Sequence, residues 1–247
     1  MVDYLNTPQG RSIAYSYVSG RSPAVVFLGG FMSDMEGSKA TFLEDWARSE
    51  GRAFLRFDYS GHGVSSGEFV DGAIGDWAED ALSIIEAKIE GPVVLVGSSM
   101  GGWISLLISK RLGDRVAGFV GIAAAPDFTE DGFWASFSEE ERSALMREGR
   151  VDVPSDYGSP YPITRRLIEE GRAQLVLRSP LTLECPVRLL QGSEDASVTR
   201  ATALRLFDHI EATDLHLELV RGADHSFSTP ICLNILKRAL GEVLELS

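Results

Sequence analysis

Six short segments of the chain are rich in apolar residues. They cover residues 24–28, 53–57, 93–96, 116–124, 187–191 and 215–220. All six are predicted strands, and the continuous apolar runs at 24–28, 93–96 and 116–124 are typical of strands that are covered on both faces. Between them, apolar residues recur at three- and four-residue spacing, which indicates helices around 39–49, 77–85, 103–108, 199–210 and 229–244. The alternation predicts an α/β fold, with a mostly parallel central sheet and helices on both faces.

The pattern near the N-terminus is different. Ile13, Tyr15 and Tyr17 alternate with smaller residues at positions 12, 14 and 16. Alternation with a period of two is typical of a strand that is buried on one face only. We therefore expect an antiparallel strand here, with one face toward water.

The alternation of strands and helices stops between residues 127 and 179. This stretch contains acidic and aromatic residues, a capping-box sequence at 138–141 and a proline-spaced loop at 154–162. It predicts two short helices, at about 139–148 and 163–170. We interpret the stretch as a small helical cap over the functional site, inserted into a single domain that spans residues 1–247.

The composition argues against several kinds of partner. The net charge of the 247 residues is −13, and no stretch approaches the roughly 20 uninterrupted apolar residues that cross a bilayer. We therefore expect no nucleic-acid partner and no stable membrane insertion. Cys185 and Cys232 fit no metal spacing and lie in separate apolar segments, so we expect reduced core thiols. The N-terminus lacks the basic start and apolar core of a signal peptide, which predicts an unprocessed cytoplasmic protein.

The strand at 93–96 and the following helix are joined by Gly97-Ser98-Ser99-Met100-Gly101, a G-x-S-x-G sequence. In a nucleophile elbow, such a serine lies on a strained turn, and the glycines remove the Cβ atoms that would collide there. The pentapeptide alone is weak support because 25 of the 247 residues are glycine. The strand before it and the helix after it make Ser99 the candidate nucleophile.

A serine nucleophile needs a base, and the chain has four histidines. His225 follows the last predicted strand, where loops at the carboxyl ends of strands gather around a site. His209 and His216 lie within a predicted helix and strand, so we interpret them as packing or surface residues. His62 follows the strand at 53–57 and either lines the site or belongs only to the geometry of its loop. We predict that His225 is the base.

The base needs an acid that orients the imidazole. Asp195 follows the strand at 187–191, with Glu194 as the neighbouring rival and helix capping as an alternative role. The order Ser99, Asp195, His225 is the one expected in α/β-hydrolases, so we predict that these residues form a catalytic triad.

The oxyanion of an acyl-transfer reaction needs at least two donors. One is expected to be the backbone NH of Met100, the residue after the nucleophile. The other is expected after the strand at 24–28, where Phe31 follows Gly29-Gly30. A plain turn is the alternative interpretation of these two glycines.

Five segments contain these residues and their neighbours: LGGFMSDMEGSKATFLE, RFDYSGHGVSSG, VLVGSSMGGW, CPVRLLQGSEDASV and GADHSF. In these segments the chain resembles the mitochondrial palmitoyl-protein thioesterase and mycophenolic acid acyl-glucuronide esterase family of α/β-hydrolases. The resemblance extends over about residues 10–245 and is weakest in the cap. It implies the α/β-hydrolase fold, a nucleophile at Ser99, an acid at Asp195 and a base at His225.

The resemblance also implies hydrolysis of thioesters such as S-palmitoyl-cysteine and of acyl glucuronide esters. We therefore expect a cofactor-free and metal-free acyl hydrolase that acts on a small molecule or an acylated protein. Two features differ from the family, because the chain begins without a mitochondrial presequence and its cap sequence is its own. The oligomeric state and the acyl-chain length stay open.

Two alternatives use the same residues. A hydrolase of carbon-carbon bonds can have the same triad, and a non-catalytic binding module can have the same fold. In the cap, apolar residues either line an acyl pocket or pack among themselves: Phe133, Trp134, Phe137, Leu145 and Met146. Four cap arginines either meet a substrate carboxylate or are solvated: Arg147, Arg150, Arg165 and Arg166.

Overall fold

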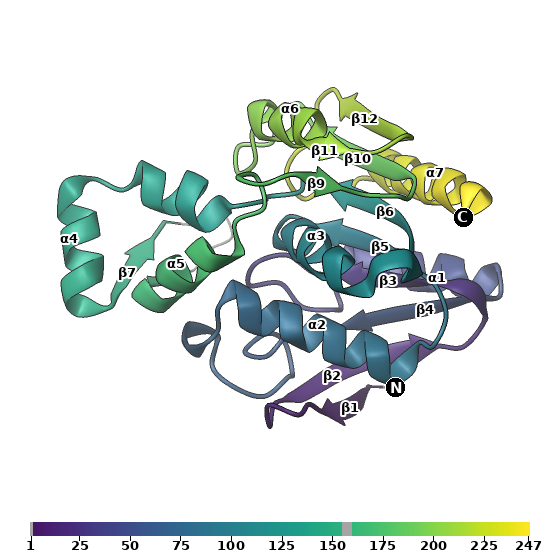
Figure 1. Ribbon diagram of the computed structural model, residues 1–247, viewed down its shortest axis with the longest axis horizontal. Coiled ribbons are helices and arrows are strands. Elements are labelled where there is room, and N and C mark those ends of the chain that lie inside the picture. Colours follow the sequence, from purple (N-terminus) through teal and green to yellow (C-terminus); the bar gives the residue numbers. More distant parts are fainter. Residues whose placement is uncertain (1, 155–159) are drawn as a thin grey trace.

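The computed structural model describes residues 2–154 and 160–247. Its main feature is an eight-stranded sheet with the order β1-β2-β4-β3-β5-β6-β10-β12 (Figure 1). These strands are β1 (Asp3–Asn6), β2 (Ser12–Val18), β3 (Arg21–Leu28), β4 (Arg52–Phe57), β5 (Val93–Ser98), β6 (Val116–Ile122), β10 (Val187–Gly192) and β12 (Leu215–Val220). From β4 to β12 neighbouring strands are parallel, whereas β1 and β2 are antiparallel to their neighbours.

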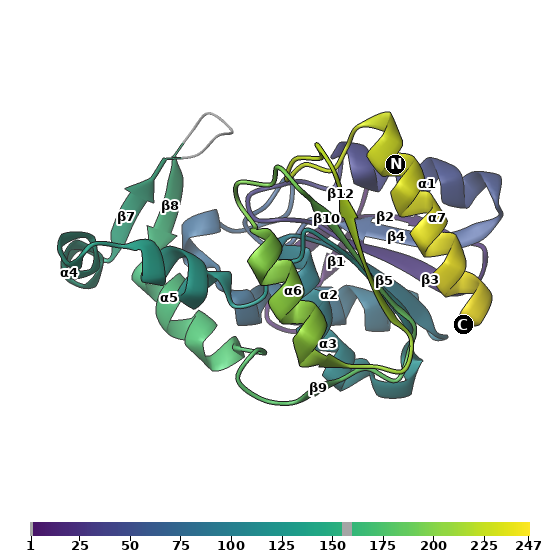
Figure 2. The same ribbon diagram turned by 90° about the horizontal axis from the view of Figure 1, so that it is seen from above.

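Helices cover both faces of the sheet (Figure 2). On one face lie α1 (Ser38–Ser49) and α7 (Pro230–Leu246), and on the other α2 (Ile74–Lys88), α3 (Met100–Leu112) and α6 (Arg200–His209). The central strands are buried throughout, since every residue of β5 is inaccessible or nearly so. The predicted fold class is therefore confirmed. Among the described residues, no helix is both long and apolar enough to cross a membrane.

The predicted wet face of the N-terminal strand is wrong. Residues 13–16 of β2 are all buried, and Tyr17 is exposed instead. Helices α1 and α2 both contact β2, from opposite faces of the sheet. On the α1 side, Ser16 donates a hydrogen bond of 3.2 Å to the buried carboxylate of Glu44. Small side chains at positions 14 and 16 allow α1 to pack closely, so the polar half of the alternation is buried as well.

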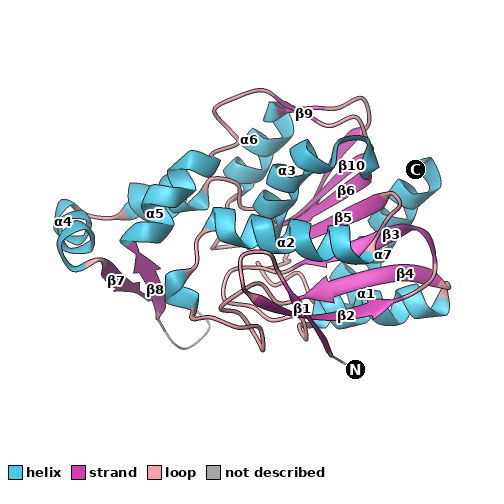
Figure 3. Cartoon of the chain, turned by 60° about the horizontal axis from the view of Figure 1, so that its bottom comes forward, coloured by secondary structure: helices cyan, strands magenta, loops and turns pink. Residues whose placement is uncertain are grey.

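The segment after β6 projects beyond the carboxyl end of the sheet (Figures 1 and 3). It contains a π-helical stretch Phe128–Trp134, α4 (Glu139–Glu148), the hairpin strands β7 (Arg150–Val153) and β8 (Tyr161–Thr164), and α5 (Arg165–Gly171). Ser138 caps α4 through the predicted capping box. The hairpin was not expected, and the middle of the predicted proline-spaced loop, 155–159, lies outside the described residues.

A few short elements complete the described chain. They are the 3₁₀ turns Phe69–Asp71, Gly113–Arg115 and Arg172–Gln174, and the paired short strands β9 (Leu181–Thr182) and β11 (Ile210–Glu211). The two cysteines are buried free thiols, as expected. Burial raises the pKa of Cys185 to about 11, so its thiol stays protonated at neutral pH.

Candidate active site

Ser99 lies between β5 and α3 with φ 54° and ψ −115°. This is the left-handed region, which a non-glycine residue adopts only when its surroundings enforce it. The flanking glycines permit the turn, because a Cβ atom on Gly97 would lie 2.4 Å from the carbonyl oxygen of Gly101. A Cβ atom on Gly101 would lie 2.1 Å from the carbonyl oxygen of Leu28. The strand and helix therefore meet too closely for any other residue, and the serine side chain is left partly exposed at the carboxyl end of the sheet.

The structure brings Ser99, His225 and Asp195 into one hydrogen-bonded chain. His225 Nε2 lies 3.1 Å from Ser99 Oγ. On the other side of the ring, His225 Nδ1 lies 2.9 Å from Asp195 Oδ2. The three residues follow β5, β12 and β10, whose carboxyl ends share one edge of the sheet. With Nδ1–H donating to the carboxylate, Nε2 is free to accept the serine proton.

Asp195 is buried and has several donors around its carboxylate. Its Oδ1 accepts from the amides of Ser197 at 2.9 Å and Val198 at 2.8 Å. Its Oδ2 accepts from His225 and also from Gln191 Nε2 at 3.0 Å. Burial acts to raise the pKa of Asp195, but the hydrogen bonds from His225, Val198 and Gln191 outweigh it and the net pKa is lowered. The carboxylate is therefore ionised at neutral pH, as its position beside the imidazole requires.

Sequence reasoning assigned no role to Gln191. The available signal was a polar residue at the end of a buried strand, directly before the loop with the acid. Glu194, the rival acid, is exposed, and its carboxylate pairs with no residue in the described part of the chain. The structure therefore places Asp195, and not Glu194, against the histidine.

The loop after β3 lies beside the nucleophile. A Cβ atom on Gly30 would be 3.5 Å from Ser99 Cβ, so the backbone passes directly next to the serine. The amide of Met32 already donates to His62 Nε2 at 3.3 Å. Within residues 2–154 and 160–247, the amides of Phe31 and Met100 make no hydrogen bond with the protein. Both predicted donors are thus unengaged: Phe31 follows the glycine that passes beside Ser99, and Met100 is the first residue of α3, where the helix dipole is positive.

His62 lies beneath this loop and does not line the site. Its side chain is almost inaccessible, and Nδ1 is 3.2 Å from the carbonyl oxygen of Ser60. A proton on Nδ1 satisfies that carbonyl and leaves Nε2 as the acceptor for the Met32 amide. Burial lowers the pKa of His62 to about 4, with partial opposition from the Ser60 carbonyl. His62 is therefore neutral and fixes the backbone of Met32, which has a positive φ of 54°.

Comparison with known proteins assigns the chain to a family. The profile of the Alpha/beta hydrolase family matches residues 25–230. The chain belongs to this family.

Individual relatives show which members of this family the chain is similar to. The mitochondrial palmitoyl-protein thioesterase ABHD10 of Rattus norvegicus is 33% identical over 246 residues, which is 99% of this chain and 82% of the relative. A solved structure of a putative hydrolase from Agrobacterium vitis S4 is 39% identical, with a TM-score of 0.94 and 98% of each chain covered. Mouse alpha/beta hydrolase domain-containing protein 10 is 32% identical, with a TM-score of 0.92, covering 99% of this chain and 98% of that one. The predicted family resemblance is confirmed.

Aromatic rings surround Phe31 where the cap meets the core. Phe69 and Trp77 come from the core, and Phe128, Phe133 and Tyr161 from the cap. Their ring centroids lie 4.9, 6.1, 5.4, 5.9 and 5.5 Å from that of Phe31, in that order. Four of these contacts are edge-to-face and that with Phe133 is tilted; edge-to-face contacts at these distances are favourable beyond the area they bury. The residue with the candidate oxyanion amide is therefore also the centre of an apolar surface shared by core and cap.

The other predicted cap residues are divided between packing and solvent. Phe137 and Leu145 are buried in the core cluster, and Met146 is exposed. Trp134 is partly buried, with the guanidinium groups of Arg142 and Arg172 over its ring. The four arginines all have carboxylate partners: Arg147 with Glu148, Arg150 with Asp152, Arg165 with Glu169, and Arg166 with Asp76. This favours the interpretation of the arginines as solvated surface charges.

The remaining histidines lie away from the nucleophile. His209 Nε2 is 2.8 Å from the carbonyl oxygen of Ser179 and 3.1 Å from that of Val176, so it ties α6 to the chain that leaves the cap. His216 is exposed beside Asp214. Both contacts agree with packing or surface roles.

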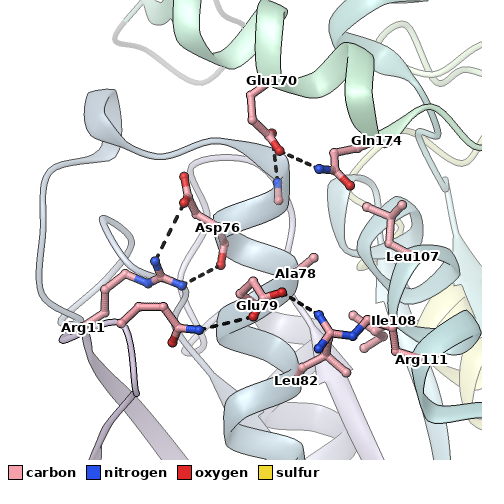
Figure 4. Close-up of a pocket in the computed structure, with 12 residues that line it drawn as sticks. Arg11, Asp76, Ala78, Glu79, Leu82, Leu107, Ile108, Arg111, Glu170 and Gln174 are labelled. Carbon is pink, nitrogen blue, oxygen red and sulfur yellow. Dashed lines mark hydrogen bonds and ion pairs between the residues drawn. The ribbon is translucent and has the colours of Figure 1, made fainter.

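A hollow of about 420 Å³ lies between α2, α3 and the cap (Figure 4). Its charged groups already pair with one another, since Arg111 contacts Glu79, and Glu170 contacts both the Gly75 amide and Gln174. Ser99 is not among its lining residues. The hollow is thus a feature of the cap-core contact and is separate from the triad.

Proposed function

We propose that this protein is a serine hydrolase that cleaves carboxylic thioesters or esters through an acyl-enzyme on Ser99. The observation that supports it is the hydrogen-bonded chain from Ser99 Oγ through His225 to Asp195, at 3.1 and 2.9 Å. Two unengaged amides also support it: that of Met100, which follows the serine, and that of Phe31, which follows the glycine beside it. This combination supplies a nucleophile, a base, an orienting acid and oxyanion donors.

In the proposed reaction, His225 Nε2 takes the proton of Ser99 Oγ as the oxygen attacks the acyl carbonyl. The amides of Phe31 and Met100 donate to the oxyanion of the tetrahedral intermediate. Collapse breaks the bond to sulfur or oxygen, and His225 gives its proton to the leaving group. Water then attacks the acyl-enzyme with His225 as base again, which releases the acid and restores Ser99.

Two considerations support thioesters and apolar acyl groups within this class. A thiol leaves with a pKa near 8.5, far below that of an alcohol, so thioester cleavage demands less acid catalysis from His225. The rings around Phe31 offer an apolar, aromatic surface, and Phe31 directly follows Gly30, whose backbone passes beside Ser99. The relatives named palmitoyl-protein thioesterases point the same way. We propose that the substrate is a small molecule or an acylated protein with its acyl group on this surface.

The test is hydrolysis of a series of S-acyl thioesters of increasing chain length, with matched oxyesters. Wild type is expected to turn over, and Ser99→Ala to lose on the order of 10⁶-fold in kcat. Ser98→Ala is the matched control, because Ser98 is the buried neighbour and its hydroxyl makes no hydrogen bond within the described residues. It should keep activity close to wild type.

The outcomes separate the alternatives. Turnover by wild type and Ser98→Ala, but not by Ser99→Ala, supports the proposal, and the chain-length profile then describes the acyl surface. If the wild type hydrolyses no acyl substrate, the proposal fails, and hydrolysis of carbon-carbon bonds or ligand binding without catalysis has to be tested instead.

A further inference from the structure

Gln191 is a buried polar residue at the end of β10, only 1% exposed. Its Nε2 is 3.0 Å from Asp195 Oδ2, 2.9 Å from the carbonyl oxygen of Val198 and 3.2 Å from that of Gly192. All three neighbours are acceptors, so the amide must present its NH₂ group to them. The opposite orientation would place the amide oxygen against three other oxygens. The hydrogen bond to Asp195 is therefore set by the surroundings.

The other half of the same amide is unsatisfied. Gln191 Oε1 is buried and has no hydrogen-bond partner within residues 2–154 and 160–247. A buried acceptor without a donor destabilises the folded protein. If packing were the only role of this position, an apolar side chain of similar volume would give a more stable fold. The contacts that Gln191 does make are to the candidate acid and to the loop that follows it.

We propose that Gln191 is a positioning residue for the triad, acting on His225 through the carboxylate of Asp195. The proposal rests on the proposed function, because it assumes that the triad is catalytic. Asp195 Oδ2 accepts from both Gln191 and His225, whereas Oδ1 accepts from the amides of Ser197 and Val198. Gln191 Nε2 and the Val198 amide thus hold the carboxylate at both oxygens, which directs Oδ2 at the imidazole.

Without the Gln191 donor, Oδ2 accepts only from His225, and the carboxylate keeps its two amide donors only at Oδ1. Its orientation toward the imidazole is then less firmly set. Loss of the donor should therefore slow the reaction.

Other titratable groups lie near this loop, and none of them hydrogen-bonds to Gln191 in the described chain. Glu194 and Asp224 are the sequence neighbours of Asp195 and His225. Lys39 donates to the carbonyl oxygen of Ser226 at 2.5 Å. Burial lowers the pKa of Lys39 to about 8, against partial opposition from Asp224, so Lys39 titrates on the alkaline side. Labelling rates below pH 7 are therefore free of the Lys39 titration.

The test measures the rate at which a fluorophosphonate labels Ser99 between pH 5 and pH 8. This readout depends on the triad and not on the acyl substrate. Gln191→Met keeps the volume and removes the donor, and it should label on the order of 10- to 100-fold more slowly at pH 7, the cost of a hydrogen bond to a charged group. Leu190→Met is the matched control, because Leu190 is the buried neighbour on the same strand.

A second variant separates positioning from folding. Gln191→Glu can donate to Asp195 only while the introduced carboxyl is protonated, so its rate relative to wild type should fall as the pH rises. A wild-type labelling rate in Gln191→Met would overturn the proposal, and a lower Tm alone would show a structural role. If Gln191→Met does not fold, a pH-independent ratio for Gln191→Glu overturns it. An unlabelled wild type would refute the proposed function itself, and this proposal with it.

Discussion

Because His62 is neutral in the folded protein, we predict that the free energy of unfolding depends on pH. His62 supports the loop with the candidate oxyanion donor, and its pKa is about 4 in the folded protein against 6.5 for a free side chain. Between these two values, the unfolded chain binds a proton at His62 and the folded chain does not. Stability therefore falls as the pH falls from 6.5 toward 4. The difference of 2.5 pH units corresponds to about 3 kcal/mol in total, and to about 2 kcal/mol at pH 5.

The substitution His62→Gln isolates this contribution. Glutamine can accept from the Met32 amide through Oε1, but it does not titrate. We expect the free energy of unfolding of wild type, relative to His62→Gln, to fall by about 2 kcal/mol between pH 7.5 and pH 5. Urea unfolding followed by tryptophan fluorescence at several pH values measures this difference, and all other titrations cancel in it.

His216→Gln is the matched control, because His216 is exposed and bonds to no backbone amide. It should leave the pH dependence of wild type nearly unchanged. A difference between wild type and His62→Gln that is constant from pH 7.5 to pH 5 would show that His62 titrates normally. The interpretation of His62 as a neutral acceptor beneath the loop would then be wrong.

Four further substitutions have clear expectations. Asp195→Asn should lower kcat about 10⁴-fold with little change in Tm, because the imidazole is left in the wrong tautomer; a loss of less than tenfold would contradict the assigned role. Gly101→Ala should destabilise the fold by about 2 kcal/mol or more in urea unfolding, since the new Cβ would lie 2.1 Å from the Leu28 carbonyl oxygen. Gly241→Ala should instead stabilise by up to about 1 kcal/mol, because its position in α7 has open space. Asp127→Asn should destabilise the folded protein by about 2 kcal/mol and speed proteolysis in the cap. The reason is that the buried carboxylate accepts from the amides at 176 and 177 and from Arg178. Unchanged proteolysis would refute this role.

Much of the fold follows from local patterns. The continuous apolar runs became buried strands of a parallel sheet because a strand covered on both faces has no polar half to expose. The segment at 215–220 became the edge strand β12 and is only partly buried. The glycines around Ser99 marked the elbow because nothing larger fits where β5 and α3 meet. Asp195 and His225 could be proposed because the carboxyl ends of parallel strands share one edge. The cytoplasmic location and the partners stay predictions, since no contact in the fold tests them.

Other features depended on neighbours that are remote in sequence. The alternation of apolar and small residues predicted that one face of β2 would be exposed. Helix α1 packs against that face and buries it. The pairing of β7 with β8 was missed for a different reason: it is local, but its strands are too short for a periodic signal.

The sequence by itself determined the family, the layers of the fold and the identity of the candidate triad. These rest on residue types whose local physics is strong: apolar β-branched runs, glycines at a forced turn, and polar side chains just after strands. Only the tertiary structure decided what each buried polar group bonds to. Gln191 faces Asp195, and His62 faces the Met32 amide, because strands and loops far apart in the sequence converge at one end of the sheet. A hydrogen bond between distant residues leaves no periodic trace in a chain, so these supporting contacts emerge only when the chain is folded.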